Sequence, residues 1–307
     1  MESCCSSGAH TVGGGRRKVK HFGDEQRAAR QLGYHAAHVA AGSGRFRVTA
    51  AFILTLAVLG FTGAFASGLV GVGGAIVMIP LLLYVPPLLG VGSLDIKTVA
   101  GVTMAQVLTA SVMGAWTHGS GAMLHRRLAL WGGMAMALGS LAGAVGSRFV
   151  GGRVLLVVFA LMATAALLLM FIAPVEPGPE AGGKTMPFNR AGAVGIPGAV
   201  GVMSGLVGAG GAFLLMPVLI GVMRVPVRLS IGTSLAMAGA GALLGFVGKL
   251  ATGQVPFIAA AAVVVGSVPG ARIGARLSRR APVSVLRWVL GAVIALVALR
   301  VWIDVLQ

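Results

Sequence analysis

Two glycine-rich segments are the part of this sequence whose residue types and spacing could do chemistry. Residues 67–80 read SGLVGVGGAIVMIP and residues 204–217 read SGLVGAGGAFLLMP, so nine of fourteen positions are identical at an offset of 137. Clustered glycines disfavour a continuous helix, because each interior glycine costs about 1 kcal/mol relative to alanine. Pro80 and Pro217 would kink any helix that ran through them. Each segment therefore predicts a broken helix.

A helix broken in this way can bind an anion without any formal charge. Its free N–H groups and the positive end of the helix dipole point at the ligand. Three glycines and one serine from each segment are the candidate substrate-binding residues: Ser67, Gly71, Gly73 and Gly74 in the first, and Ser204, Gly208, Gly210 and Gly211 in the second. The alternative is that these small residues only let helices pack closely.

Four polar residues early in the following apolar segments complete the candidate site: Thr103, Gln106, Thr233 and Ser234. Their hydroxyls either line a pathway or bond to their own helix four residues back. A functional role is favoured for Gln106, because a side-chain amide needs partners in lipid. The second half has Thr-Ser where the first has Thr-Met, which predicts an asymmetric site.

Other features have simpler interpretations. We expect Lys249, at a helix end, to extend its ammonium to the membrane interface. Arg272 is either a helix-end residue or a counter-ion for an anion. Asp95 lies beside Lys97 in a turn, which favours a solvated ion pair over proton coupling. Glycines four residues apart are assigned to helix packing: Gly139 and Gly143, Gly241 and Gly245, and Gly266, Gly270 and Gly274.

The elements that carry these residues are strongly hydrophobic. Of 307 residues, 57% are apolar and 10% charged, and the mean hydropathy is +0.93; soluble proteins carry about 25% charged residues. The longest charge-free run covers 47 residues, 48–94, and one helical crossing needs about 20. Because open strands cannot satisfy their backbone in lipid, we expect an all-α, multi-pass protein of the cell membrane, with the bilayer as a partner.

The net charge of +17 does not indicate nucleic-acid binding. Residues 1–47 hold eight of the Lys and Arg residues, and most of the others flank apolar runs. Two tyrosines and four tryptophans leave little for base stacking. We therefore expect no nucleic-acid partner. Residues 1–47 lack hydrophobic periodicity and are interpreted as a basic, disordered tail.

The duplication extends beyond the glycine segments. Residues 102–105 have a counterpart at 232–235, and the pattern GSxxGA at 139–144 recurs at 266–271. We therefore expect two homologous helical repeats, 48–173 and 191–307, joined by a polar linker at 174–190.

Each repeat is expected to contain four or five spans, and an odd number would invert one repeat relative to the other. The ten predicted helices are 48–66, 74–90, 97–118, 126–147, 152–173, 191–207, 210–223, 227–249, 254–274 and 282–303. With a cytoplasmic tail this count places the arginines between 276 and 287 outside, against the positive-inside tendency. Eight spans therefore stay open as an alternative.

The duplicated GLVGxGGAxxxxP element, followed in each half by a threonine-containing helix, resembles the sulfite exporter TauE/SafE family of membrane permeases. The resemblance covers the chain from about residue 50 to its C-terminus. It implies a permease whose substrate is a small anion, with sulfite, sulfonates or related sulfur-containing anions as the leading class.

We expect a secondary transporter that works by alternating access around the two breaks, with no cofactor and no metal. The alternatives are a non-transporting structural or assembly subunit and a membrane-embedded enzyme. The sequence has no HExxH, no GxSxG and no clustered acidic ligands, which disfavours an enzyme. A homo-oligomer is left open.

Overall fold

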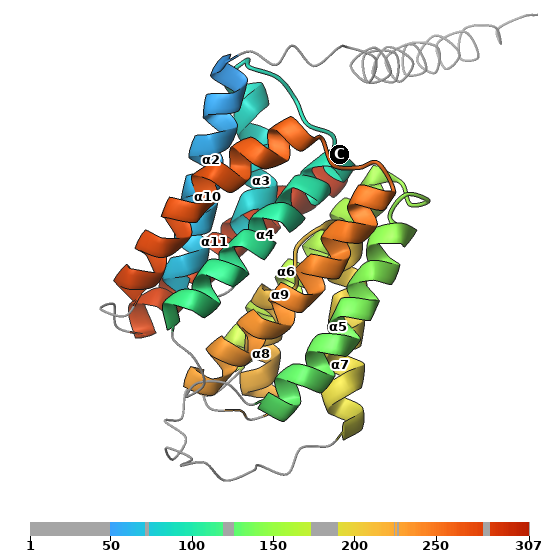
Figure 1. Cartoon of the computed structure of the whole chain (residues 1–307), viewed down its shortest axis with the longest axis vertical. Helices are drawn as coiled ribbons and strands as arrows, with labels where there is room; N and C mark the ends of the chain where they lie inside the picture. The colour runs from blue at the N-terminus through green and yellow to red at the C-terminus, as the bar shows by residue number, and fades with distance from the viewer. Residues whose placement is uncertain are drawn as a thin grey trace, which may run out of the picture. The chain divides into compact units, whose positions relative to one another are not determined.

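The long apolar runs of the chain fold into α-helices, which satisfy their own backbone hydrogen bonds (Figure 1). The computed structural model describes residues 50–70, 74–118, 126–172, 190–223, 225, 227–278 and 283–306. These residues form α2 (Ala50–Val70), α3 (Ala75–Leu88), α4 (Ile96–His118), α5 (Arg126–Gly146), α6 (Gly152–Ile172), α7 (Arg190–Val207), α8 (Ala212–Gly221), α9 (Val227–Ala251), α10 (Phe257–Ser278) and α11 (Val283–Leu306). The predicted tail and nearly all of the predicted linker lie outside the described residues.

The all-α membrane fold is confirmed. The described residues form ten helices and no strand, and the predicted helix bounds differ from the observed ones by at most four residues. Over the same residues, six helices are long and apolar enough to cross a bilayer: α2, α4, α5, α6, α9 and α10.

The helices that follow the two glycine segments are short. α3 has 14 residues and α8 has 10, which corresponds to lengths of about 21 Å and 15 Å. The hydrocarbon core of a bilayer is about 30 Å thick. Neither helix is therefore long enough to cross it unaided, as the prediction of broken or half-length helices requires.

Glycines form the contact seams between long helices. A Cβ added to Gly266 would lie 1.9 Å from the Ala57 carbonyl oxygen, and one on Gly270 would lie 2.3 Å from that of Phe61, so α10 packs directly on the α2 backbone. On α5, a Cβ on Gly143 would lie 2.1 Å from the Val202 oxygen of α7. These contacts confirm the packing role predicted for the glycines spaced at four.

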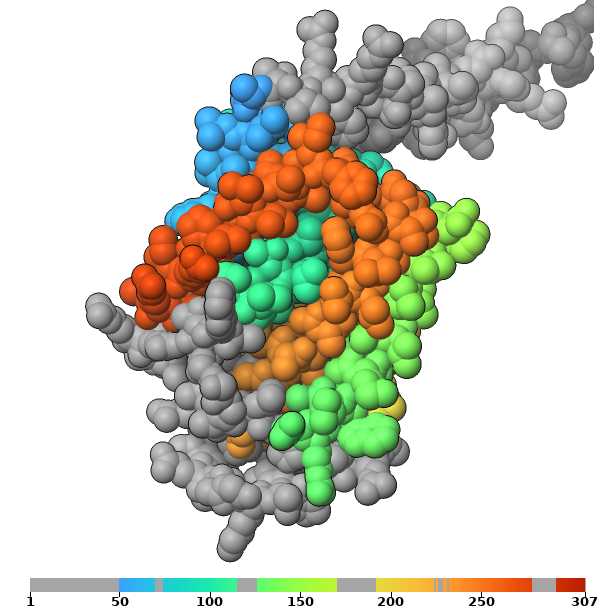
Figure 2. All heavy atoms as spheres, viewed as in Figure 1, coloured from blue at the N-terminus to red at the C-terminus, as the bar shows by residue number. Residues whose placement is uncertain are grey.

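The helices of the two expected halves interleave. α2 packs along α10 and α7 along α5, while α9 contacts both α4 and α5, and α6 contacts α11. Residues 49–307 accordingly form one compact unit. On the face shown in Figure 2, side chains of α4 fill the interval between α10 and α9.

Contacts along the central pair of helices give their relative direction. Gly114, near the end of α4, faces Leu235 near the start of α9, whereas Met104 of α4 faces Gly245 of α9. α4 and α9 are therefore antiparallel. This is the direction that an inverted repeat requires of its equivalent helices, and the relationship of the complete halves stays a prediction.

Candidate functional site

At the first break the chain turns back beside the helix that precedes it. Gly74 is the N-cap of α3 and has a φ of +58°. A Cβ on Gly74 would lie 2.4 Å from Ser67 Cβ and 2.7 Å from the Gly63 oxygen. Gly63 is eleven residues earlier in the chain, a separation of about 16 Å along a continuous helix. The chain has therefore reversed, and α3 starts part-way along α2.

The second break has the same local geometry. Gly211 is the N-cap of α8 and has a φ of +66°. A Cβ there would lie 3.0 Å from Val200 Cγ1 and 3.1 Å from Ser204 Cβ, which are eleven and seven residues earlier, the same offsets as in the first break. Hence α8 also starts part-way along the helix before it.

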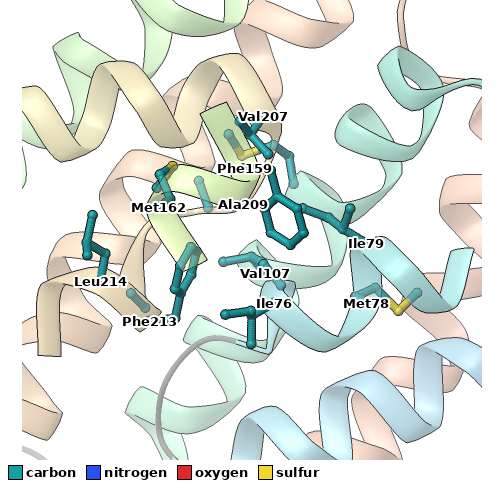
Figure 3. Close-up of a cluster of buried hydrophobic side chains, with 14 of the residues drawn as sticks. Ile76, Met78, Ile79, Val107, Phe159, Met162, Val207, Ala209, Phe213 and Leu214 are labelled. Carbon is teal, nitrogen blue, oxygen red and sulfur yellow. The ribbon is translucent and has the colours of Figure 1, made fainter. Parts of the chain in front are cut away.

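Both short helices begin inside the protein without a capping side chain. The N-caps Gly74 and Gly211 are glycines and supply no side-chain hydrogen bond to the first turn, and the first residues of α3 and α8 are buried. The first N–H groups of any helix lack acceptors within it. In Figure 3 the first-turn residues Ile76 of α3 and Phe213 of α8 lie in one apolar cluster with Val107 of α4. Two positive helix ends therefore face a shared, largely apolar interior.

The second break rests directly on α4. A Cβ on Gly208 would lie 2.2 Å from the Ala100 oxygen, and one on Gly210 would lie 2.3 Å from Val107 Cγ1. Both glycines have positive φ, +83° and +62°, a region that residues with a Cβ rarely adopt. Glycine is thus required at both positions by conformation as well as by space.

Thr103 and Gln106 are three residues apart on α4, so they lie on the same side of that helix. Thr103 lies between Ala100 and Val107 on the helical stripe that faces the second break, and its hydroxyl donates to the Val99 oxygen at 2.8 Å. Of the two predicted alternatives, the Thr103 hydroxyl therefore makes the hydrogen bond to its own helix. Gln106 shares a face with Ala110, which packs in a small cluster of buried residues from α2 and α10.

Gln106 is fully buried, and neither its amide nitrogen nor its amide oxygen has a hydrogen-bond partner among the described residues. A buried amide without partners costs about 1–3 kcal/mol for each group left unpaired. Such an orphan group is a feature of sites that bind a ligand or water. Gln106 is therefore the predicted site residue whose surroundings most clearly call for a ligand.

The remaining predicted site residues are also buried. The Ser204 hydroxyl donates to the Gly201 oxygen of its own helix at 3.0 Å, while Ser67 lies against Gly74. Thr233 and Ser234 are fully buried in α9. Gly71 and Gly73 lie outside the described residues, so the structure places ten of the twelve predicted residues.

The prediction for Lys249 is wrong. Its side chain has no exposed surface. The ammonium donates to Ser147 Oγ at 2.7 Å, to the Leu206 oxygen at 3.1 Å and to Gln254 Oε1 at 3.1 Å. The sequence signal that could have indicated burial is the position of this single charge between two charge-free runs of 20 or more residues, 229–248 and 250–271.

Two other charged residues lie away from the candidate site. The Arg272 side chain is exposed, so its interpretation as a counter-ion in the interior is wrong. The Asp95 carboxylate accepts the backbone N–H of Lys97 at 3.2 Å, while the Lys97 ammonium donates to the Arg148 oxygen at 3.0 Å. Asp95 thus stabilises the first turn of α4 instead of forming the expected ion pair.

The fold and the two breaks define a class of polytopic helical membrane protein with paired half-length helices. The sequence model of the sulfite exporter TauE/SafE family matches residues 56–301, and the chain belongs to that family. This membership makes it a membrane transport protein.

Curated relatives match a similar share of the chain. A probable membrane transporter protein of Xylella fastidiosa (strain 9a5c) is 32% identical over 257 residues, which cover 81% of this chain and 94% of the relative. The probable membrane transporter protein YdhB of Bacillus subtilis (strain 168) is 28% identical over 233 residues, 75% of this chain and 89% of its own. No solved structure matches the chain.

Proposed function

We propose that this protein is a secondary transporter that carries small sulfur-containing anions, sulfite or sulfonates, across the cell membrane by alternating access. The observation that carries the proposal is the pair of buried helix N-termini at Gly74 and Gly211, where glycine at the N-cap supplies no capping side chain. An uncapped N-terminus presents backbone N–H donors and a positive dipole end. Two of them in one apolar interior suit a small anion better than a cation or a neutral solute.

Gln106 supports the same assignment. Its buried amide has no protein partner among the described residues, so an oxyanion that accepts from its nitrogen would satisfy this donor. Neutral donors also suit a transporter, because a carrier must release its substrate as well as bind it. A fixed cation in close contact at every stage would hold the anion too tightly.

The direction of the central helices supports alternating access. α4 and α9, at equivalent places in the two expected halves, are antiparallel and in contact. Inverted repeats commonly place the substrate site between their broken helices and move against one another around it. The family name and the relatives named as probable membrane transporters support transport, and the sulfur-containing anion is the finer part of the proposal.

The proposal is tested by uptake into proteoliposomes that contain the purified protein. Labelled sulfite, methanesulfonate, thiosulfate and sulfate are each supplied outside, and empty liposomes give the background. We expect wild-type uptake of sulfite or methanesulfonate above that background. Gly210→Leu should abolish it, because the new side chain would enter Val107.

Gly195→Leu is the matched control, since Gly195 of α7 has open space around it. We expect this variant to transport at the wild-type rate. Uptake by the wild type no faster than by empty liposomes would support the structural-subunit alternative. Equal, undiminished flux through Gly210→Leu and Gly195→Leu would exclude the breaks as the transport site.

A further inference from the structure

The Lys249 ammonium is a buried cation without an anionic partner among the described residues. Its three acceptors, a hydroxyl, an amide and a backbone carbonyl, are all neutral. The acidic side chains that the structure describes are engaged elsewhere: Asp95 binds the Lys97 N–H, and Asp304 pairs with Arg300 at 2.8 Å and accepts from Tyr84. Within the part of the chain that the structure describes, a charge on Lys249 is therefore compensated by dipoles alone.

Dipoles compensate this charge only in part. The Leu206 carbonyl belongs to the last turn of α7, where the helix dipole is negative. Even so, a buried ion carries a desolvation penalty of several kcal/mol, which an opposite charge offsets far better than neutral groups do. A lysine that served only to join α5, α7 and α9 could be replaced by a neutral hydrogen-bonding residue without this penalty. A bound anion would offset the penalty of the charged form.

Lys249 lies close to the second glycine break. Its acceptor Leu206 precedes Gly208 by two residues. On the other side, Gly101 of α4 packs against the backbone oxygen of Gln254, which would lie 2.7 Å from a Cβ added to Gly101. The neighbouring Ala100 packs against Gly208. Gln254, which accepts from the lysine, and the break thus contact the same turn of α4.

The partners of Lys249 can themselves turn towards an anion. The Ser147 hydroxyl accepts from Lys249 and donates within the protein, to the Ala144 oxygen at 2.6 Å. The Gln254 amide nitrogen donates to Thr252 Oγ1 at 2.8 Å. Rotation of the hydroxyl or the amide would direct an N–H or O–H donor at an oxyanion held by the ammonium. Three donors around one charge are a suitable set for a sulfite or sulfonate group.

We propose that Lys249, Ser147 and Gln254 form a second anion-binding site, next to the second break, that holds the transported oxyanion as it enters or leaves the central site. This inference rests on the proposed function. In the structure the Lys249 ammonium donates to neutral oxygens. When an oxyanion binds, the ammonium gives up one or more of these hydrogen bonds and donates to the anion instead. The site supplies the formal charge that the central site lacks.

The test compares purified wild type with Lys249→Met in detergent. Thermal unfolding is measured at increasing sulfite or methanesulfonate, with chloride at equal ionic strength as the reference. A ligand that binds only the folded state raises the midpoint, because it adds RT ln(1 + [L]/Kd) to the free energy of unfolding. We expect the apparent Kd from this rise to increase about tenfold or more in Lys249→Met. Uptake of the anion into proteoliposomes should also be slower for Lys249→Met than for the wild type.

Arg272→Met is the matched control, because it removes one positive charge from an exposed position. It should keep the wild-type anion response. If Lys249→Met does not yield folded protein, Gln254→Leu changes a less buried member of the site and should weaken the response severalfold. If Lys249 had only a structural role, Lys249→Met would lower the unfolding midpoint measured without anion but leave the anion-induced rise unchanged.

An unchanged anion-induced rise in Lys249→Met or in Gln254→Leu would overturn the inference. The proposed function would stand as long as the wild type takes up the anion. Absence of wild-type uptake would instead overturn the proposed function, whatever the thermal response to the anion.

Discussion

Gly208 shows how one residue fixes the shape of the second break. Its φ of +83° and its contact with the Ala100 backbone both exclude a side chain. The sequence indicates glycine here only through the repeat, because a single glycine in an apolar segment is compatible with an ordinary helix. The repeat identifies the break, and the contact with α4 explains why glycine is needed at this position.

We expect Gly208→Ala to lower stability more than Gly253→Ala does. Gly253 also has a positive φ, +69°, but no atom lies within 4 Å of an added Cβ. Both variants carry a left-handed strain of about 1–2 kcal/mol, and only Gly208→Ala adds a clash with backbone. Thermal unfolding in detergent measures the difference. Equal midpoints for the two variants would contradict this account of Gly208.

Gln106 allows function and stability to be separated. Gln106→Leu removes a buried amide that has no partner among the described residues, so we expect the unfolding midpoint to stay the same or rise. If the amide binds substrate, sulfite uptake into proteoliposomes should nevertheless fall about tenfold. A variant with full uptake would remove Gln106 from the proposed site.

Lys249 is one of the residues for which sequence reasoning failed. A lysine at the end of an apolar helix is usually drawn to the interface by its long side chain. Here the Lys249 ammonium is bound by Ser147, from a distant part of the chain, and by Gln254, five residues further along. The burial depends on packing between segments separated by about a hundred residues, which local sequence does not reveal.

At the scale of elements, glycine seams set how closely the helices approach. The spacing of four residues correctly predicts which glycines face a neighbouring helix, because residues i and i+4 share a helical face. It does not identify the neighbour. That α10 packs on α2, and α5 on α7, follows from the complementary surfaces of segments far apart in the chain.

We predict that Gly143→Ala separates α5 from α7. Its Cβ would lie 2.1 Å from the Val202 oxygen, so the helices must move apart, at a cost of about 1–3 kcal/mol. Gly146→Ala on the same helix meets only Leu206 Cδ2, at 4.0 Å, and should be neutral or slightly stabilising. The unfolding midpoints of the two variants check this. A smaller decrease in the unfolding midpoint for Gly143→Ala than for Gly146→Ala would contradict close packing of α5 on α7 at Gly143.

At the scale of the whole molecule, the contacts assign helix ends to two sides. Ser147 and Lys249 bring the end of α5 to the end of α9. At the other end of α5, a Cβ on Gly132 would lie 3.2 Å from the Ala193 oxygen near the start of α7. Helix ends that meet in this way must lie on the same side of a membrane, and opposite ends of α5 on opposite sides.

Cysteine labelling in intact cells tests this assignment. In a background with Cys4 and Cys5 changed to serine, Gly151→Cys and Gly253→Cys should react with a membrane-impermeant maleimide from one side. Gly192→Cys should react from the other. All three positions have open space around them. Reaction of all three from a single side would reject the ten-helix arrangement in favour of fewer crossings.

The sequence by itself determined the membrane class, the helix bounds and the positions of the two breaks, because these depend on local properties: charge-free length, backbone satisfaction in lipid and the conformational preference of glycine. The tertiary structure decided which residues meet. It reversed the chain at Gly74 and Gly211, set the second break against α4, left Gln106 without a partner among the described residues and buried Lys249. These outcomes depend on contacts between distant segments, which arise only when the two halves pack together.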